Sequence, residues 1–299
     1  MLRLLKIITL VILLWVLPVS AGQASGIDAL FDTETSERIE LLLKNRISSP
    51  TSLVSVSRLL SHDQISSAYQ QREFRPVWFD GWRLRLEAQT LLEYLRNAGE
   101  HGLCGNDYLL AELEGLLRIQ ADFSKHSLPL APDNRAVLDL FLSQAFLTYA
   151  THMVEGQVDP ALTHVDWRAR RRKADLVKLL GYATENHRMS QVLEGLTPPH
   201  EEYRRLIDAL KHYQLISASG GWPEIPSGPS IRPGASDDRL PLLKALLLKT
   251  GDLEGNSDET PDYDKETQQA IRLFQIRHGL EEDGVVGPKT LETLNVSVD

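Results

Sequence analysis

The sequence has few of the residues that support disulfide or metal chemistry. Cys104 is its only cysteine, so the 299-residue chain can form no internal disulfide and no cysteine-based metal site. Its nine histidines include no His-x-x-x-His pair, and the stretch His200-Glu201-Glu202-Tyr203 lacks the second histidine of a zinc protease helix. We therefore expect no metal, no cofactor and a core that depends on packing alone.

An excess of positive charge and a membrane-length apolar run are also missing. The net charge is −9, and because residues 1–21 contain Arg3 and Lys6 but no acid, the remainder carries −11. Nucleic acid is excluded as a partner, since its binding depends on Lys and Arg contacts to phosphates. The apolar run Ile7–Leu17 has 11 residues, with only Thr9 polar, whereas a membrane span needs about 20.

The N-terminus instead has the form of a secretory signal. Arg3 and Lys6 precede the apolar run, Pro18 ends it, and Val19-Ser20-Ala21 places small residues before a cleavage site at Gly22. The sequence thus predicts a signal peptide over residues 1–21 and a periplasmic protein that meets the membrane only through this peptide. An uncleaved anchor is the alternative, and no cysteine lies near the site to carry a lipid.

Most of the remaining chain has the apolar spacing of helices. No alternating strand pattern longer than four residues occurs before Tyr213, so we predict an all-α fold. Asp133 or Asn134 is expected to cap the second of these helices. The expected helices are Ala88–Leu95, Asn134–Val154, Leu176–Leu180, Ser190–Leu196 and Glu201–Tyr213.

A Pro- and Gly-rich stretch, residues 217–234, is the clearest break in the chain. It reads as a linker or extended strap, with Trp222 and Ile225 docking on a neighbouring surface. A small three-helix domain is expected after it, with Gly251 ending its first helix, Asp264 capping the second and Pro288 opening the third. Its structural core is predicted from the apolar positions Leu243, Leu247, Ile271, Phe274, Leu291 and Leu294.

The end of the chain resembles a peptidoglycan-binding module. The resemblance rests on Phe274-Gln275, then Gly279-Leu280, then the loop Asp283-Gly284-Val285-Val286-Gly287-Pro288 between two helices. We expect the loop to need the positive φ of glycine at Gly284 and Gly287. The resemblance implies peptidoglycan as the partner, but the sequence assigns no residue to a ligand contact.

A longer series of motifs extends the resemblance over roughly residues 65–296. In order, these are QREFRPVWFDG from Gln71, HGLCGNDY from His101, EGQVDP from Glu155 with Trp167, LTPPHEEYRRL from Leu196 with Tyr213, GWPEIPSG from Gly221 and IRPG from Ile231. The series resembles the scaffold domain of the large Gram-negative L,D-transpeptidases. The resemblance implies a signal peptide (1–21), a helical scaffold-like domain (22–216), a linker (217–234) and a peptidoglycan-binding-like domain (235–299).

The family's catalytic domain carries a Ser-His-Gly-Cys stretch, and this sequence has none. His101-Gly102-Leu103-Cys104 is only a faint echo, because a base three residues from a thiol in a loop seldom faces it. No catalytic residue is predicted. The expected function is non-catalytic peptidoglycan binding, as the front part of an L,D-transpeptidase involved in wall cross-linking. The alternatives are a free-standing adaptor that recruits other wall enzymes and an enzyme with an unrecognised site.

The charged clusters are interpreted as solvated surface. This applies to Asp237-Asp238, Glu281-Glu282-Asp283 and the acids from Asp252 to Asp264, which lack the opposed, partly dry pair of carboxylates that glycosidases need. A weak Ca²⁺ site is the alternative, although the spacing is not that of an EF-hand loop. The basic run from Arg168 to Lys173 is expected on a solvated helix face, with lipid headgroups or wall-peptide carboxylates as an alternative. Trp78 and Trp222 are interpreted as core or docking aromatics rather than sugar platforms.

Overall fold

The computed structural model of the protein describes residues 21–45, 62–158, 171–255 and 260–298. Helices dominate these residues, and the one sheet among them has two strands of two residues each, which confirms the predicted all-α fold. Two compact units divide the chain between Tyr203 and Arg204. The division falls inside helix α10 (Glu201–Ala218), which continues two residues into the predicted 217–234 linker. The predicted signal peptide lies outside the described residues, apart from Ala21.

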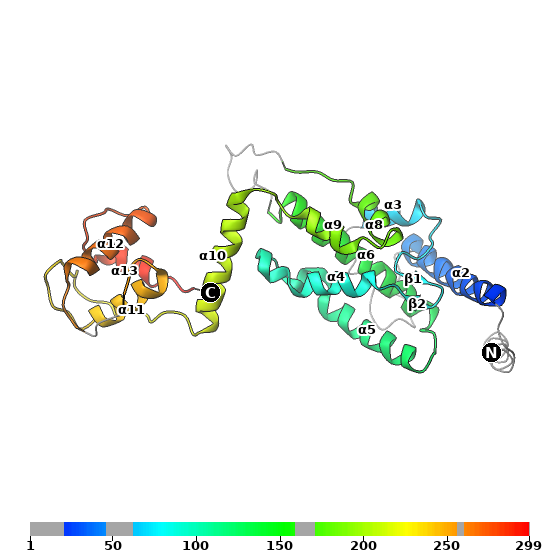
Figure 1. Ribbon diagram of the computed structural model, residues 1–299, viewed down its shortest axis with the longest axis horizontal. Helices are drawn as coiled ribbons and strands as arrows, with labels where there is room; N and C mark the ends of the chain where they lie inside the picture. The colour runs from blue at the N-terminus through cyan, green and yellow to red at the C-terminus, as the bar shows by residue number, and fades with distance from the viewer. Residues whose placement is uncertain (1–20, 46–61, 159–170, 256–259, 299) are drawn as a thin grey trace. The chain divides into compact units, whose positions relative to one another are not determined.

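The N-terminal unit is built around helix α6 (Pro132–Glu155), which is buried on nearly every side, as expected for a central helix. In Figure 1, α6 lies among the other helices of the unit. Other helices of the unit pack against it, α2, α5 and α8 among them. The elements that surround it are α2 (Ala21–Asn45), α3 (His62–Gln70), β1 (Phe79–Asp80), β2 (Arg83–Leu84), α4 (Glu87–Arg96), η2 (Ala98–His101), η3 (Gly105–Tyr108), α5 (Leu110–Lys125), α8 (Leu176–Glu185) and α9 (Met189–Leu196).

A buried carboxylate on α6 organises the segment between α3 and β1. Asp139 is fully buried and accepts hydrogen bonds from the backbone N–H of Val77 at 3.0 Å, from that of Trp78 at 2.8 Å and from the Tyr69 hydroxyl. Ser143, one turn further along α6, contacts the same tyrosine and accepts the Trp78 indole N–H at 2.9 Å. Trp78 is therefore a core residue, one of the two interpretations that the sequence allowed.

Helix α2 is tied to α6 by a buried arginine. The Arg135 guanidinium donates from Nε to the Thr35 hydroxyl at 2.9 Å and from its terminal nitrogens to the Leu130 and Phe31 carbonyls. Its contact with Glu34 is longer, at 3.5 Å. Because neutral oxygens supply most of its acceptors, Arg135 fixes the α2–α6 geometry through hydrogen bonds more than through charge pairing.

Beyond its part of α10, the described C-terminal unit contains three helices and an extended strap, residues 219–234. The helices are α11 (Leu240–Thr250), α12 (Lys265–Arg277) and α13 (Pro288–Leu294). Gly251 adopts φ +77° after α11, the Asp264 carboxylate accepts from the Thr267 N–H at 2.7 Å, and Pro288 stands in the first turn of α13. These three predicted helix boundaries are confirmed.

Other local predictions were wrong. Helix α6 begins at Pro132, ahead of both predicted caps, because proline needs no N–H partner in the first turn, and Ala131 precedes it without a side-chain cap. The described part of the basic run, from Arg171 to Lys173, is not helical. Arg168 and Arg170 lie outside the described residues, as does Trp167. Among the residues that the structure does describe, no helix combines the length and apolarity needed to cross a membrane.

Candidate functional site

Helices α11, α12 and α13 enclose one apolar core. Five of the residues proposed for it are buried to at least 97%, and Leu291 packs against them while partly exposed. The buried five are Leu243, Leu247, Ile271, Phe274 and Leu294. The Phe274 ring also faces His278, with ring centroids 4.1 Å apart, and the Arg277 guanidinium lies 5.7 Å from its centre. A single large side chain thus contributes both to the core and to the end of α12.

The loop before α13 is held by a buried glutamine on α12. Gln275 accepts the Gly284 N–H at 2.9 Å and donates to Asp283 at 2.9 Å and to the Val285 carbonyl at 3.1 Å. The Tyr263 hydroxyl donates to the Gly284 carbonyl at 2.6 Å, and burial raises the pKa of this tyrosine. The loop is therefore tied to α12 and Tyr263 by hydrogen bonds.

Glycine serves two different purposes in this loop. Gly284 has φ +72°, as expected, and a Cβ there would lie 3.1 Å from the Gln268 side chain. Gly287 has φ −86° and ψ −178°, so the expectation of a positive φ was wrong at this position. Gly287 is instead the extended residue that precedes α13, a conformation open to other residues.

The strap packs on the helices of its own unit. Ile225 and Ile231 are buried, and the backbone of Ile231 forms an isolated antiparallel bridge with Val286. The Asn295 side chain accepts the Ile225 N–H at 2.8 Å and donates to its carbonyl at 2.9 Å, as a neighbouring strand would. Docking of Trp222 and Ile225 is confirmed, because Trp222 packs on the same core and donates its indole N–H to the Val296 carbonyl.

A hollow of about 350 Å³ lies where the end of α10, the start of the strap and the C-terminal tail meet. Its lining includes the Trp222 ring, the exposed Glu224 carboxylate and the Asn295 amide. Gly221, at φ +70°, forms part of the wall, and a Cβ there would approach Val298 to 3.3 Å. The hollow combines an aromatic face, an acceptor and small polar groups, a set that suits hydroxyl- and amide-bearing rings.

Two charged side chains of the unit are little exposed, and one of them, Asp252, was expected at the surface. Asp252 was interpreted as surface, but its side chain is only 7% exposed and pairs with Arg277 at 2.5 Å. Arg277 also donates to the Tyr213 hydroxyl at 3.2 Å. Lys244 is buried and donates to the Thr260 hydroxyl at 3.0 Å, with Asp264 3.3 Å away. These pairs brace the connection between α11 and α12.

The His-Gly-Leu-Cys stretch of the N-terminal unit is not arranged as a base and a nucleophile. The His101 Nδ1 forms a hydrogen bond of 2.8 Å with the Tyr203 hydroxyl, and the two rings are stacked. Partial burial lowers the pKa of His101. Cys104 is exposed and directly precedes η3. The histidine is therefore engaged with a tyrosine on α10.

The all-α fold and the helical core of the C-terminal unit define a chain with a helical body and a small three-helix module at its C-terminal end. Family comparisons identify both parts. Residues 63–210 match the family described as "Scaffold domain", and residues 236–294 match the family described as "Putative peptidoglycan binding domain". The chain thus contains both domains, an arrangement consistent with the non-catalytic front part of an L,D-transpeptidase. No curated protein shows a significant sequence match.

The peptidoglycan-binding domain supports a role in binding the cell wall and a wall-associated location. Its matched segment includes the three helices, the hydrogen-bonded loop before α13 and the predicted core. The hollow beside Trp222 lies just outside the segment, at the residues that flank its two ends. Sequence reasoning missed this hollow because its walls come from residues 217–224 and 295–298, which only the fold brings together.

Proposed function

We propose that the protein is exported to the periplasm and binds peptidoglycan through its C-terminal unit, with the hollow beside Trp222 receiving part of the glycan. The match of residues 236–294 to a peptidoglycan-binding domain carries this proposal. The predicted signal peptide supports the location, because peptidoglycan lies outside the cytoplasmic membrane.

The chemistry of the hollow favours an amino sugar. The Trp222 ring offers an apolar face, while its N–H is already used by Val296, so the ring contributes contact area rather than a donor. The Glu224 carboxylate can accept a sugar hydroxyl, and the nearby Asn295 holds the strap in place. Lys249 donates to the Gly221 carbonyl and holds this part of the lining in place.

We further propose that this binding serves wall cross-linking, in the manner of the front part of an L,D-transpeptidase. The order of the two domains supports the proposal. In this role the C-terminal unit holds the polymer, and the helical unit contributes a scaffold on which wall enzymes act. Recruitment of a separate wall enzyme is the alternative use of the same architecture.

The experiment is retention of the full chain on purified wall sacculi. Trp222→Ala and Glu224→Gln are each expected to weaken retention at least about threefold, the size of one lost hydrogen bond or contact. Phe123→Ala is the matched control, because Phe123 is an aromatic residue exposed to 40% in the other unit. Circular dichroism must show that all three variants keep their helices.

Retention that is unchanged in both hollow variants would remove the hollow from the proposal. No retention of the unmodified chain would remove the wall-binding function itself. The location is tested separately by mass spectrometry of the mature N-terminus, which is expected at Gly22 in the periplasmic fraction. Intact Met1 in membranes would show an uncleaved anchor instead.

A further inference from the structure

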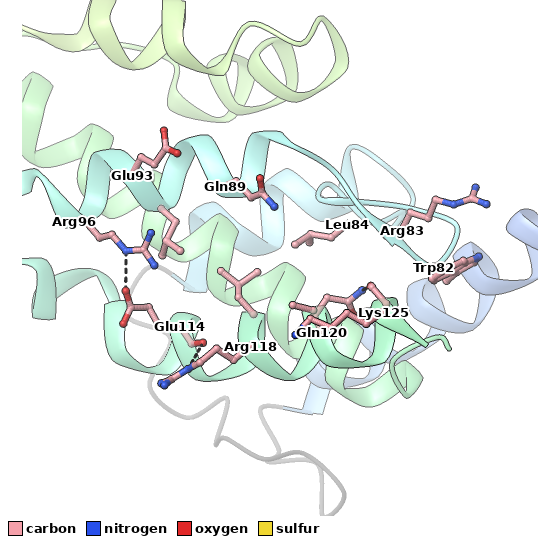
Figure 2. Close-up of a pocket in the computed structure, with 14 residues that line it drawn as sticks. Trp82, Arg83, Leu84, Gln89, Glu93, Arg96, Glu114, Arg118, Gln120 and Lys125 are labelled. Carbon is pink, nitrogen blue, oxygen red and sulfur yellow. Dashed lines mark hydrogen bonds and ion pairs between the residues drawn. The ribbon is translucent and has the colours of Figure 1, made fainter. Parts of the chain in front are cut away.

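A cavity of about 940 Å³, larger than the hollow beside Trp222, lies along helices α4 and α5 of the N-terminal unit (Figure 2). The β1–β2 hairpin contributes Trp82, Arg83 and Leu84 to its lining, and the remaining lining residues come from the two helices. Its volume is at the upper end of the range of about 300–1,000 Å³ typical of small-molecule sites. The wall-binding domain does not contribute to it.

Several cationic side chains line this cavity of an acidic protein. Its lining includes four cationic side chains and only two carboxylates, Glu93 and Glu114, although the whole chain carries a net charge of −9. The cations are Arg83, Arg96, Arg118 and Lys125. Lys125 pairs with Asp122 at 2.9 Å and Arg83 lies 3.9 Å from Asp28. Arg96 and Arg118 are therefore the groups that favour an anionic ligand.

Two of the arginines can still bind a carboxylate through their terminal nitrogens. Arg96 donates from Nε to the Glu114 carboxylate at 2.8 Å, and Arg118 donates from Nε to the Glu114 carbonyl at 3.2 Å, as the dashed lines in Figure 2 show. Neither guanidinium makes another hydrogen bond to the described residues. Each is thus held by one nitrogen and presents the planar pair that recognises carboxylates bidentately.

A buried side-chain amide in the lining has a carbonyl oxygen that accepts no hydrogen bond. Gln120 is only 3% exposed and donates from Nε2 to the Ser124 hydroxyl at 3.0 Å. Its Oε1 is covered and has no hydrogen-bond partner among the described residues. Buried polar atoms are normally paired. The terminal torsion of glutamine is broad, so this oxygen can turn toward a ligand N–H or O–H.

The aromatic residue of the lining is engaged by a neighbouring arginine. The Arg83 guanidinium carbon lies 5.1 Å from the centre of the Trp82 ring, in a cation–π contact. One face of the ring is therefore already used. Leu84, Leu92 and Leu117 add apolar wall that suits short aliphatic side chains. An acidic peptide has all the groups that this lining can bind. It offers carboxylates to the arginines, backbone N–H groups to Gln120 and small apolar groups to the leucines.

We propose that this cavity binds a short acidic peptide, with its carboxylates on Arg96 and Arg118 and a backbone N–H on Gln120 Oε1. The proposal stands independently of wall binding by the C-terminal unit, because it depends only on residues of the N-terminal unit.

Calorimetric titration of the full chain tests it with defined probes. The peptide Ac-Glu-Ala-Glu-NH₂ is expected to bind, and its isosteric counterpart Ac-Gln-Ala-Gln-NH₂ to bind at least about tenfold more weakly, since charge-assisted hydrogen bonds are the stronger ones. Binding of the acidic peptide is expected to weaken as salt is added, because the cations are partly exposed. Chitotriose and inorganic phosphate serve as a neutral sugar and a simple anion.

The variants separate the roles of the side chains. Arg118→Gln is expected to weaken binding of the acidic peptide about tenfold. The matched control is Arg188→Gln, a solvent-exposed arginine elsewhere in the unit that contacts Gln191 at 3.2 Å. Gln120→Leu is expected to weaken binding while leaving the unfolding midpoint unchanged or higher, because it removes an unpaired buried oxygen.

Four results would overturn the proposal. These are no binding of the acidic peptide, equal binding of its glutamine counterpart, equal or tighter binding of chitotriose or phosphate, and equal effects of Arg118→Gln and Arg188→Gln. Because Arg118 is exposed, its substitution tests binding without threatening the fold. The outcome does not depend on retention by sacculi, so each proposal can fail without the other.

Discussion

Replacement of Asp139 tests whether the buried carboxylate on α6 holds the N-terminal unit together. Asp139→Ala removes the acceptor of the Val77 and Trp78 backbone N–H groups, whereas the Tyr69 hydroxyl keeps Ser143 as a neighbour. Each buried donor left unpaired costs about 1–3 kcal/mol. The variant is therefore expected to lower the free energy of unfolding by about 2–6 kcal/mol, a large part of the roughly 5–15 kcal/mol typical of a domain.

Asp139→Asn is the milder change and separates hydrogen bonding from charge. Asparagine has one carbonyl oxygen, so one of the two backbone donors meets an NH₂ group instead of an acceptor. We expect a loss of about 1–3 kcal/mol. Asp133→Asn is the matched control on the same helix, since Asp133 forms a more exposed pair with Arg38 at 3.2 Å. It is expected to cost less than about 1 kcal/mol.

The pH dependence gives a second signature. Burial raises the pKa of Asp139 from its ordinary value of 3.8 to about 6, against the opposing effect of its hydrogen-bond donors. The folded state then binds a proton more tightly than the unfolded state. The stabilising contribution is complete below pH 3.8 and is lost as the pH rises through 6. The stability gap between the unmodified chain and Asp139→Asn should widen by about 1 kcal/mol from pH 7 to pH 5.

Urea unfolding followed by far-UV circular dichroism measures these differences, and hydrogen exchange at Val77 and Trp78 locates them. Faster exchange at these two amides is expected in both Asp139 variants and not in Asp133→Asn. Equal destabilisation by Asp139→Asn and Asp133→Asn would refute the structural role of Asp139. A gap that stays constant or narrows on acidification would refute the raised pKa.

Two further predictions concern the module core and the lone cysteine. Phe274→Ala should lower the free energy of unfolding by about 3–5 kcal/mol, as truncation of buried phenylalanines does. It should abolish sacculus retention together with the circular dichroism signal of the helices in the C-terminal unit. Lost retention with an intact signal would make Phe274 a ligand contact instead. The chain should form no acyl adduct with a carbapenem, because His101 is engaged by Tyr203 rather than presented to Cys104; a mass increase on Cys104, absent from Cys104→Ser, would contradict this.

Features that depend on nearby residues could be predicted from the sequence. The cap at Asp264, the glycine after α11 and the proline of α13 each follow from one residue and its immediate neighbours. The apolar spacing of α12 likewise indicated its buried side, including Ile271 and Phe274. Such signals operate over one or two turns, where the chain's own geometry fixes which residues meet.

Features that join distant segments could not be predicted in this way. Asp139 accepts hydrogen bonds from residues more than 60 positions earlier in the chain. Asp252 is covered by Arg277, which lies 25 residues later, on helix α12. The cationic cavity gathers Arg83, Arg96 and Arg118 from three elements, none of which is unusually basic by itself. A charged residue's role depends on what faces it, and spacing along one helix does not contain that information.

The two proposed sites suit different parts of the same polymer, which leads to a last prediction. Peptidoglycan combines glycan strands with short peptides that carry carboxylates. The hollow beside Trp222 offers an aromatic face and the acceptor Glu224, whereas the cavity along α4 and α5 offers cations. Both sites belong to one chain. Once one site has bound the wall, binding at the second site is intramolecular, so the two together retain the chain more strongly than either alone.

The full chain carrying both Glu224→Gln and Arg118→Gln should therefore be retained by sacculi less than either single variant. The effects of the two changes on the free energy of retention should add, because the residues lie in separate units and share no partner. Glu224→Gln with Arg188→Gln is the matched double control and should equal Glu224→Gln alone. If Arg118→Gln changes retention no more than Arg188→Gln, the cavity takes no part in wall binding. Its peptide would then have to come from another source.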